Sequence, residues 1–346
     1  MSDTFEAALT RVREMFAVVG FSDGGLLLHL GSGDFFALDP GGASLWQAVL
    51  ESGTAAEAVS AVSRTKNLAG QAARVAVERL VRQGLQLNAE PPANIHRFED
   101  DGRCLSLLRA GQVVLTFDRS RLLLTSGPAL LERLADDGDI EDALRIVVPK
   151  ILGAWFPLAL HASAVEHNGT AFLFSGDSGS GKTTTARLVV EELTETRLMA
   201  EDVSLIATVA GQAYLVEGAE GVIHAWMEQT AATLARCTGM PVDAASFRAA
   251  LDDCSGRLPV HRITFLDRAR RNGLTWRLVS LTHAAALQRL FLHNFPCSAA
   301  PVVLRQQLAS LRQLASTLDI KEADAIPEGL ANLRRAIRAQ SETIMS

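Results

Sequence analysis

One glycine-rich stretch of the sequence has the residue types and spacing for phosphate chemistry. It reads GDSGSGKT and fits the pattern G-x-x-x-x-G-K-[S/T] of a phosphate-binding loop. Its glycines let backbone N–H groups face a phosphate chain, and the N-terminus of a following helix adds partial positive charge. Lys182 would reach the β- and γ-phosphates of ATP, and Thr183 would hold Mg²⁺. The residues expected to contact the nucleotide are Gly176, Asp177, Ser178, Gly179, Ser180, Gly181, Lys182, Thr183 and Thr184.

A pair of carboxylates, Glu201-Asp202, follows the next short apolar run after this loop. Phosphoryl transfer needs little covalent help from the protein, so a nucleotide loop, Mg²⁺ and one carboxylate that orients or deprotonates the acceptor hydroxyl are sufficient. We expect Asp202 to be that carboxylate. The alternative is a solvated turn, which the position of the pair at a strand end after a phosphate loop disfavours.

The elements on either side of the loop agree with its assignment. Residues 160–165 and 170–174 predict two strands, and Asn168-Gly169 between them is a strong hairpin signal. After the loop, residues 184–193 contain good helix formers and no breaker. Further along, the patterns predict strands at 198–200, 203–206, 263–268 and 316–320, a hairpin around Gly211-Gln212, and helices at 224–237, 284–295 and 328–338.

The N-terminal part of the chain predicts a small unit of its own. After a short helix or lead-in strand within residues 1–20, two apolar runs at 26–30 and 35–38 indicate a β-hairpin. Three helices are expected next, and the second begins with a capping pattern at Thr54-Ala55-Ala56-Glu57. The sequence Pro91-Pro92 then indicates a linker. The predicted division is 1–88, a linker at 89–96, and a second domain at 97–346 that begins with short strands and a helix; the three N-terminal helices are placed at 43–50, 54–63 and 69–83.

Composition describes an ordinary globular protein of up to two domains, with 48% hydrophobic and 21% charged residues among 346. The formal net charge of −6 and the scattered arginines argue against a nucleic-acid or membrane partner. The longest apolar run is too short to span a bilayer. Four separated cysteines suggest neither a zinc site nor a disulfide framework, so a reducing cytoplasm is expected; they are Cys104, Cys237, Cys254 and Cys297.

Residues 26–87 resemble the PqqD-type peptide chaperones, also called precursor-peptide recognition elements. The resemblance rests on the hairpin with Phe35-Phe36, the Asp39-Pro40 turn, the Leu45-Trp46 helix and the Thr-x-x-Glu cap. It implies a winged-helix-like α+β domain that holds the leader of a ribosomally made peptide as an added strand. Its open hairpin edge would pair with the leader, and Val75 and Leu80 would form part of a groove floor. An ordinary winged helix or a dimerisation module is the alternative.

The order LHASAV, hairpin, GDSGSGKT, helix, LMAED resembles the HPr kinase/phosphorylase-like P-loop kinases, which are related in their core to phosphoenolpyruvate carboxykinases. The resemblance covers residues 160–268 and implies an α/β P-loop kinase domain in which Lys182 and Thr183 bind ATP·Mg²⁺. Glu201-Asp202 matches the acidic pair of the family, which is normally two Asp. The departure leaves open which carboxylate is the base and which binds the metal.

The same resemblance adds weaker candidates. His161 matches a family histidine that could contact the acceptor or a phosphate, and it is equally well explained as a hydrogen-bonded structural residue. Glu217 is a candidate for Mg²⁺ or for the acceptor side, with an exposed hairpin end as its alternative. The Glu-x-Arg-Gly segment of true HPr kinases lacks its Arg here, so HPr is not the expected substrate. Arg262 and Arg268 could neutralise phosphate charge but are expected to be surface arginines.

These patterns together predict a cytoplasmic, ATP-dependent serine/threonine peptide kinase. The N-terminal domain would bind the leader of a ribosomally synthesised precursor peptide, and the second domain would phosphorylate a Ser or Thr hydroxyl. A kinase for a free small-molecule hydroxyl and a non-catalytic nucleotide-dependent adaptor are the alternatives. A homo-oligomer and a phosphorylase or phosphatase activity stay open. The predicted catalytic residues are Asp202, Glu201, His161 and Lys182, and the predicted metal ligands are Thr183, Asp202 and Glu217.

Overall fold

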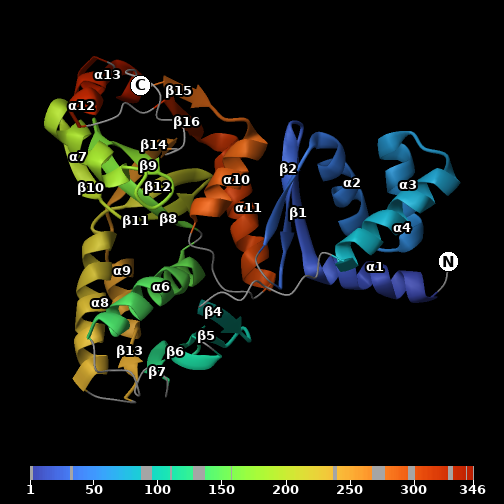
Figure 1. Cartoon of the computed structure of the whole chain (residues 1–346), viewed down its shortest axis with the longest axis horizontal. Coiled ribbons are helices and arrows are strands. Elements are labelled where there is room, and N and C mark those ends of the chain that lie inside the picture. The colour runs from blue at the N-terminus through green and yellow to red at the C-terminus, as the bar shows by residue number, and fades with distance from the viewer. Residues whose placement is uncertain are drawn as a thin grey trace.

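The strands of this mixed α/β protein form three sheets in the part of the chain that the structure describes. Figure 1 shows the arrangement in a computed structural model. The helix expected near the front of the second domain was placed around 130–134 and 143–152; the first of these ranges lies outside the described residues, and the second is helical. Most of the predicted linker also lies outside the described residues, so the division into domains stays a prediction. The described residues are 3–31, 34–86, 96–109, 111–127, 137–156, 158–236, 240–266, 277–294, 301–325, 330–339 and 341–345.

The N-terminal sheet contains the predicted hairpin and one strand more. The hairpin is confirmed, because Leu27 pairs with Phe36 in antiparallel register. The first twenty residues hold a helix as well as a strand, and that strand pairs with the first hairpin strand. The capping box of Thr54 and Glu57 is present. The elements are α1 (Asp3–Met15), β1 (Phe16–Phe21), β2 (Gly24–His29), β3 (Phe35–Leu38), α2 (Pro40–Leu50), α3 (Ala55–Lys66) and α4 (Gly70–Gln86); the winged-helix-like description stays a prediction.

Strand β2 is buried on both faces, which ties the N-terminal unit to the rest of the chain. On one face Leu27 packs among α1 to α4, and on the other Leu26 and Leu28 share a core with α10 (His283–His293) and α11 (Pro301–Thr317). The ring of Phe35 meets that of Phe291 edge-on, with centroids 5.1 Å apart. Figure 1 shows β1 and β2 beside α10 and α11. A fragment of residues 1–88 would therefore expose an apolar sheet face, so tests of this unit belong in the full chain.

A five-stranded antiparallel sheet follows, in the order β13-β7-β6-β5-β4. In its core, the ring of Phe117 packs edge-on against that of Trp155, and the ring of Trp226 stacks on that of Phe247 with centroids 4.3 Å apart. This packing fixes helices α6 and α8, which form one wall of the candidate site. The elements are β4 (His96–Asp100), β5 (Cys104–Arg109), β6 (Gln112–Asp118), β7 (Leu123–Ser126), α6 (Asp137–Trp155), α8 (Ala219–Arg236), β13 (Val242–Asp243) and α9 (Ala245–Asp252).

The eight-stranded sheet carries the predicted phosphate loop. Its pairings close a cycle through β8, β9, β14, β12 and β11. Both predicted hairpins are confirmed, and at their turns Asn168, Gly169, Ala210 and Gly211 have positive φ, as a two-residue type I′ turn requires. The strands are β8 (Leu158–His167), β9 (Thr170–Ser175), β10 (Thr196–Ala200), β11 (Val203–Val209), β12 (Gln212–Val216), β14 (Arg257–Leu266), β15 (Arg277–Ser280) and β16 (Asp319–Ala325).

The prediction of a strand at 316–320 was wrong at its start, because α11 continues to Thr317. Leu304, Leu308 and Leu311 lie on the buried face of this helix, and Leu314 extends that helical spacing into the segment where the strand was expected. The strand itself begins at Asp319 and runs parallel to β14.

The C-terminal helices α12 (Leu330–Ala339) and α13 (Ser341–Met345) close the core next to the helix that follows the phosphate loop, α7 (Lys182–Glu192). Arg334 and Arg338 pair with Glu191 and Glu192 of α7. The expectation that Arg262 lies on the surface was wrong, because it is buried, pairs with Asp319 at 2.6 Å, and donates to carbonyls of α13. Arg268 lies outside the described residues. Among the helices that are described, none combines the length and apolar character needed to cross a membrane.

Candidate functional site

The predicted phosphate loop connects the end of β9 to the start of α7. Gly176, Gly179 and Gly181 all have positive φ, of 142°, 71° and 97°. A Cβ at Gly176 would lie 2.4 Å from the backbone oxygen of Leu266, so glycine is required there for close approach as well as for conformation. The loop therefore depends on its glycines for the curled path that precedes the helix.

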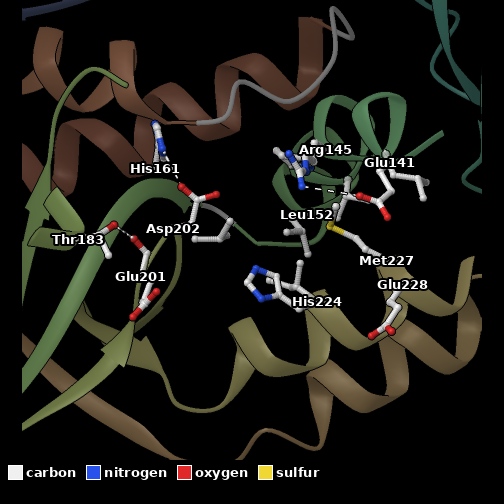
Figure 2. Close-up of a pocket in the computed structure, with 15 residues that line it drawn as sticks. Glu141, Arg145, Leu152, His161, Thr183, Glu201, Asp202, His224, Met227 and Glu228 are labelled. Atoms are coloured by element: carbon white, nitrogen blue, oxygen red, sulfur yellow. Dashed lines mark hydrogen bonds and ion pairs between the residues drawn. The ribbon is translucent and has the colours of Figure 1, made fainter. Parts of the chain in front are cut away.

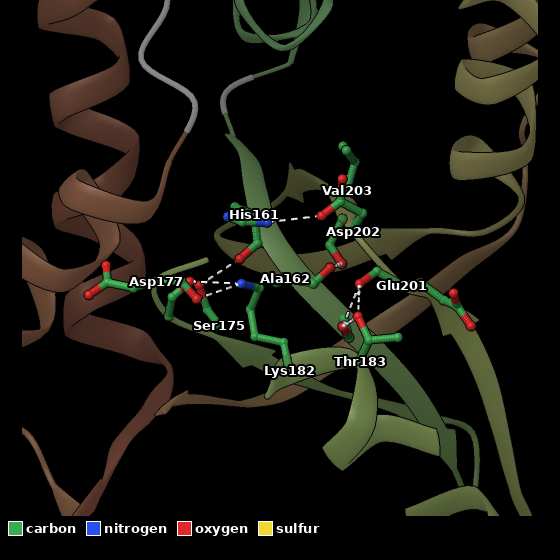
Figure 3. A network of polar contacts seen from close by, with 12 residues as sticks. His161, Ala162, Ser175, Asp177, Lys182, Thr183, Glu201, Asp202 and Val203 are labelled. Atoms are coloured by element: carbon green, nitrogen blue, oxygen red, sulfur yellow. Dashed lines mark hydrogen bonds and ion pairs between the residues drawn. The ribbon is translucent and has the colours of Figure 1, made fainter. Parts of the chain in front are cut away.

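The side chain of Lys182 occupies the interior of this loop. Its side chain is buried, and Nζ donates to the carbonyl oxygens of Gly176 and Asp177, both at 3.0 Å. Burial lowers the pKa of Lys182, while the charges of Asp202 and Asp177 oppose that shift. Figure 3 shows the ammonium held against the loop backbone.

The hydroxyl of Ser180 indicates whether the loop could bind an anion. Its Oγ is buried and has no hydrogen-bond partner within the described part of the chain. A buried hydroxyl without a partner loses the hydrogen bonds it would make in water, so a phosphate oxygen here would satisfy it. Asp177, Ser178 and Thr184 are exposed on the same loop and its helix. The residues present therefore fit a bound phosphate chain.

Thr183 lies in the first turn of α7 and faces the turn that follows β10. Its hydroxyl donates to the backbone oxygen of Glu201 at 3.1 Å, and the hydroxyl of Ser163 donates to the same oxygen. A hydroxyl that donates its proton keeps its oxygen lone pairs available to a cation. The position of Thr183 thus suits the predicted contact with Mg²⁺, and Ser163 is a supporting residue that the sequence patterns missed.

Asp202 lies in the turn between β10 and β11 and points toward β8. His161 Nε2 donates to Asp202 Oδ1 at 2.9 Å, while 63% of the Asp202 side chain remains exposed to an adjacent cavity. The hydrogen bond from His161 is the main cause that lowers the pKa of Asp202, and nearby positive charge at Lys182 adds to it. Asp202 is therefore an ionised carboxylate whose side chain is largely exposed.

Glu201 has a different environment from its neighbour. Its carboxylate forms a two-pronged ion pair with Arg187, with Nε to Oε1 at 2.9 Å and NH2 to Oε2 at 2.8 Å. This pairing lowers the pKa of Glu201. Figures 2 and 3 show the Glu201 carboxylate turned away from Asp202, so only its backbone oxygen faces Thr183. The geometry favours Asp202 over Glu201 as the reacting carboxylate.

Glu220 holds the turn that carries both residues. Its carboxylate accepts hydrogen bonds from three successive backbone N–H groups, those of Glu201 at 2.8 Å, Asp202 at 2.6 Å and Val203 at 3.1 Å. It lies in the first turn of α8, directly after Gly218 with φ 76°. Glu220 is not among the predicted site residues, because the helix was predicted at 224–237 and the observed helix begins earlier, at Ala219, which places this acidic residue in its first turn.

Glu217 is not brought to the other predicted metal ligands. Its carboxylate lies 3.6 Å from the guanidinium of Arg197, and its backbone N–H donates to Gly256. Across the described residues, no group of three or more His, Cys, Asp or Glu could hold a metal ion by itself. Mg²⁺ in nucleotide sites commonly binds one or two protein ligands together with substrate phosphates. Of the predicted metal ligands, Thr183 and Asp202 both line one cavity.

A cavity of about 580 Å³ lies beside Asp202, between the start of α7 and helices α6 and α8. Figure 2 shows His161, Asp202 and His224 directed into it. His224, on α8, was missed from the sequence because nothing in its local pattern relates it to the loop. The polar end contains His161, Thr183, Glu201, Asp202 and His224; the opposite wall contains Leu144, Val148, Pro149, Leu152, Ile223 and Met227, with Glu141, Arg145 and Glu228 at its margin.

Comparison with known proteins identifies one family match. Residues 24–88 match the PqqD family, described as coenzyme PQQ synthesis protein D. No curated protein matches the chain in sequence. Among solved structures, the HPr(Ser) kinase/phosphatase from Coxiella burnetii is similar at 10% identity and a TM-score of 0.25, over 54% of this chain and 99% of that one. At this TM-score the likeness does not by itself establish the fold.

Proposed function

We propose that this protein is an ATP-dependent kinase that phosphorylates a Ser or Thr hydroxyl of a ribosomally synthesised precursor peptide. The observation that carries the proposal is the ionised Asp202, which faces a cavity next to Lys182 and Thr183 of a phosphate-binding loop. The match of residues 24–88 to PqqD supports a peptide as the partner, because PqqD-type proteins are chaperones that hold the leader of a precursor peptide.

Residues 176–184 would hold the phosphates of ATP through loop N–H groups, the Ser180 hydroxyl and the Lys182 ammonium. Thr183 would hold Mg²⁺ together with the phosphates, and the ion when bound would neutralise the charge of the transferred phosphoryl group; in this scheme Asp202 acts as the base and does not bind the metal. Lys182 would move from the loop carbonyls that it now contacts to the phosphates, at little cost because both are oxygen acceptors.

Asp202 would accept the proton of the acceptor hydroxyl as that oxygen bonds to phosphorus. His161 orients the carboxylate through one oxygen and leaves the other for the acceptor. Glu220 fixes the backbone of the turn, so that the carboxylate keeps its position when the acceptor enters. The role of Glu201 in this scheme is structural, through Arg187 and through its backbone oxygen.

The leader would bind at the outer edge of β3. A groove beside this edge is lined by the side chains Leu27, Phe36, Leu38, Trp46, Gln83 and Gln86. The expected floor residues were wrong: Val75 is 54% exposed and Leu80 packs into the helical core, because the groove meets the C-terminal end of α4 and not its middle. The outer edge of β3, which pairs with no other strand among the described residues, would supply main-chain hydrogen bonds, and the groove would select apolar leader side chains.

Phe36→Ala is expected to raise KM for the full precursor about tenfold with little change in kcat at saturating substrate. The reason is that Phe36 lines the groove and packs among the N-terminal helices, and it does not line the cavity beside Asp202, so it contributes uniform binding. Steady-state kinetics of the full chain measure this, with Val75→Ala at an exposed position of α4 as the control and a melting curve for each variant. An unchanged KM in folded Phe36→Ala contradicts leader docking at β3.

A kinase for a free small-molecule hydroxyl is the second candidate. The cavity volume of about 580 Å³ favours it, because small-ligand sites have volumes in that range. A small acceptor has no contact with the β3 groove, so its KM would be the same for Phe36→Ala and the unaltered chain. The Phe36→Ala kinetics therefore separate the two candidates.

His161→Ala is expected to move the acidic limb of the kcat profile to higher pH. The hydrogen bond from His161 is the largest cause that lowers the Asp202 pKa, so its loss raises that pKa. A base works only when ionised, and activity would then be lost at a higher pH as the solution is acidified. A pH–rate profile measures the shift, with His167→Ala at the far end of β8 as the control. An acidic limb in the same place for both variants contradicts Asp202 as the titrating base.

A further inference from the structure

The part of β8 that leads to His161 is not paired with its hairpin partner. β9 pairs with β8 only from Ala162 onward, because the chain leaves the sheet after Ser175 and enters the loop. Along the other edge, β11 pairs with β8 from Leu158 to His161. Buried backbone N–H and C=O groups are rarely left unpaired, so the edge that β9 leaves open requires another partner.

Asn294, the residue at the C-terminal end of α10, pairs with that open edge. The Ala159 N–H donates to Asn294 Oδ1 at 3.1 Å, and Leu160 forms an isolated antiparallel bridge with Asn294. The side chain is only 3% exposed, so these contacts are buried. The two residues directly before His161 are thus held by a residue that lies 135 positions after Ala159.

His293, which precedes Asn294, fixes the same end of α10 to another strand. It is buried, and its ring stacks on that of Phe265 with centroids 5.3 Å apart. Phe265 lies opposite Ser175, the last residue of β9, in the parallel pairing of β14 with β9. Burial lowers the pKa of His293 to about 4, so the ring is uncharged at neutral pH and packs as an aromatic group. The end of α10 is therefore held against both β8 and β14.

Helix α10 is also held along its length by the N-terminal unit. Gln288 Nε2 donates to the backbone oxygen of Gly25 in β2 at 3.2 Å, and Leu287 shares a core with Leu26. Figure 1 shows α10 between β2 and the eight-stranded sheet. A side chain on a packed helix keeps its position more precisely than one on a loop. Asn294 is therefore a rigid support for the segment that carries His161.

We propose that Asn294 is a positioning residue for phosphoryl transfer, which holds the backbone before His161 so that this histidine orients the Asp202 carboxylate. The inference rests on the proposed kinase function. The contact that it maintains is the hydrogen bond from His161 Nε2 to Asp202 Oδ1 at 2.9 Å. A misplacement of about 1 Å at a catalytic group can cost about 10²-fold in rate. Loss of the Asn294 contact should lower kcat and leave the binding of ATP, whose phosphates would contact the loop, little changed.

The test is a double-mutant cycle of Asn294 and His161 in the full chain. The assay is ³²P transfer from ATP to the short precursor peptide encoded nearest to this gene. Asn294→Ala is expected to lower kcat about tenfold, with the KM for ATP changed less than about twofold. In the His161→Ala background, Asn294→Ala should lower kcat by less than about a further twofold, because the residue through which it acts is gone.

Gln307→Ala is the matched control. Gln307 is as buried as Asn294, and its Nε2 donates to the backbone oxygen of Gly153 at 3.0 Å, which ties α11 to α6 and not to β8. Its loss also removes a buried hydrogen bond between a side-chain amide and the backbone, so a lowered melting temperature with little change in kcat is expected. If Asn294→Ala does not fold, Asn294→Ser makes the same cycle, because its hydroxyl lies one bond closer to the backbone and does not reach the Ala159 N–H.

The outcomes separate this inference from the function on which it rests. A merely structural effect does not act through His161, so it would lower kcat by the same factor in both backgrounds. Equal losses, or an unchanged kcat in the folded Asn294 variant, overturn the positioning role and leave the kinase function in place. If the unaltered chain transfers no phosphate to the peptide, the proposed function is overturned, and the inference with it.

Discussion

Lys182→Ala is expected to lower phosphoryl transfer by about 10²- to 10³-fold or more, the range for removal of one preorganised electrostatic group. Lys182 is the only charged side chain that lies inside the described loop curl, and its Nζ bonds nothing but loop carbonyls. ATP-dependent ³²P transfer to the cognate substrate measures the loss, and Lys66→Ala, at an exposed position of α3, is the control.

The fold should survive this change. Burial lowers the pKa of Lys182, which means that its surroundings disfavour the charge, so its removal relieves a desolvated group. Each variant is therefore melted beside the unaltered chain. A Lys182→Ala variant with an unchanged melting curve and a near-original rate would show that the loop does not act on a phosphate chain.

Asp202→Asn is expected to lower kcat by about 10²-fold or more while ATP binding changes less. Asparagine matches the shape of aspartate and can accept the hydrogen bond from His161, but it cannot take a proton at neutral pH. The fall therefore reports the chemistry of the carboxylate and not its packing. Separate determination of kcat and of KM for ATP tests this prediction.

Glu201→Gln is the matched comparison, one residue away. Its effect should be milder, since the Glu201 carboxylate is occupied by Arg187 and only its backbone oxygen contacts Thr183. If Glu201→Gln is the more damaging change, the roles of the two neighbours must be exchanged.

The features that follow from short stretches of sequence could be predicted. The glycine conformations of the loop at 176–181, the turn at Asn168-Gly169, the hairpin around Gly211 and the Thr54 capping box each depend on a few adjacent residues, and the structure contains these local conformations. The pairing of β8 with β9 likewise follows from a single hairpin. Such features need no knowledge of where the rest of the chain lies.

The parts that could not be predicted depend on contacts between distant segments. Glu220 reaches the turn of Asp202 only because α8 begins beside it, and His224 faces the cavity because α8 packs against α6. Arg262 has the sequence context of a surface residue, but in the structure it is buried by contacts with β16 and α13. The burial of β2 on both faces also requires α10 and α11, which follow it by some two hundred and fifty residues.

The central claim is tested most directly by intact-mass spectrometry of a precursor peptide co-expressed with the full chain. The short peptide encoded nearest to this gene is the substrate to use, with Lys182→Ala in parallel. The proposed function predicts that the peptide gains the mass of one phosphoryl group on a Ser or Thr with the unaltered chain and gains none with Lys182→Ala. An unmodified peptide in both samples, with the folded kinase present, would contradict it.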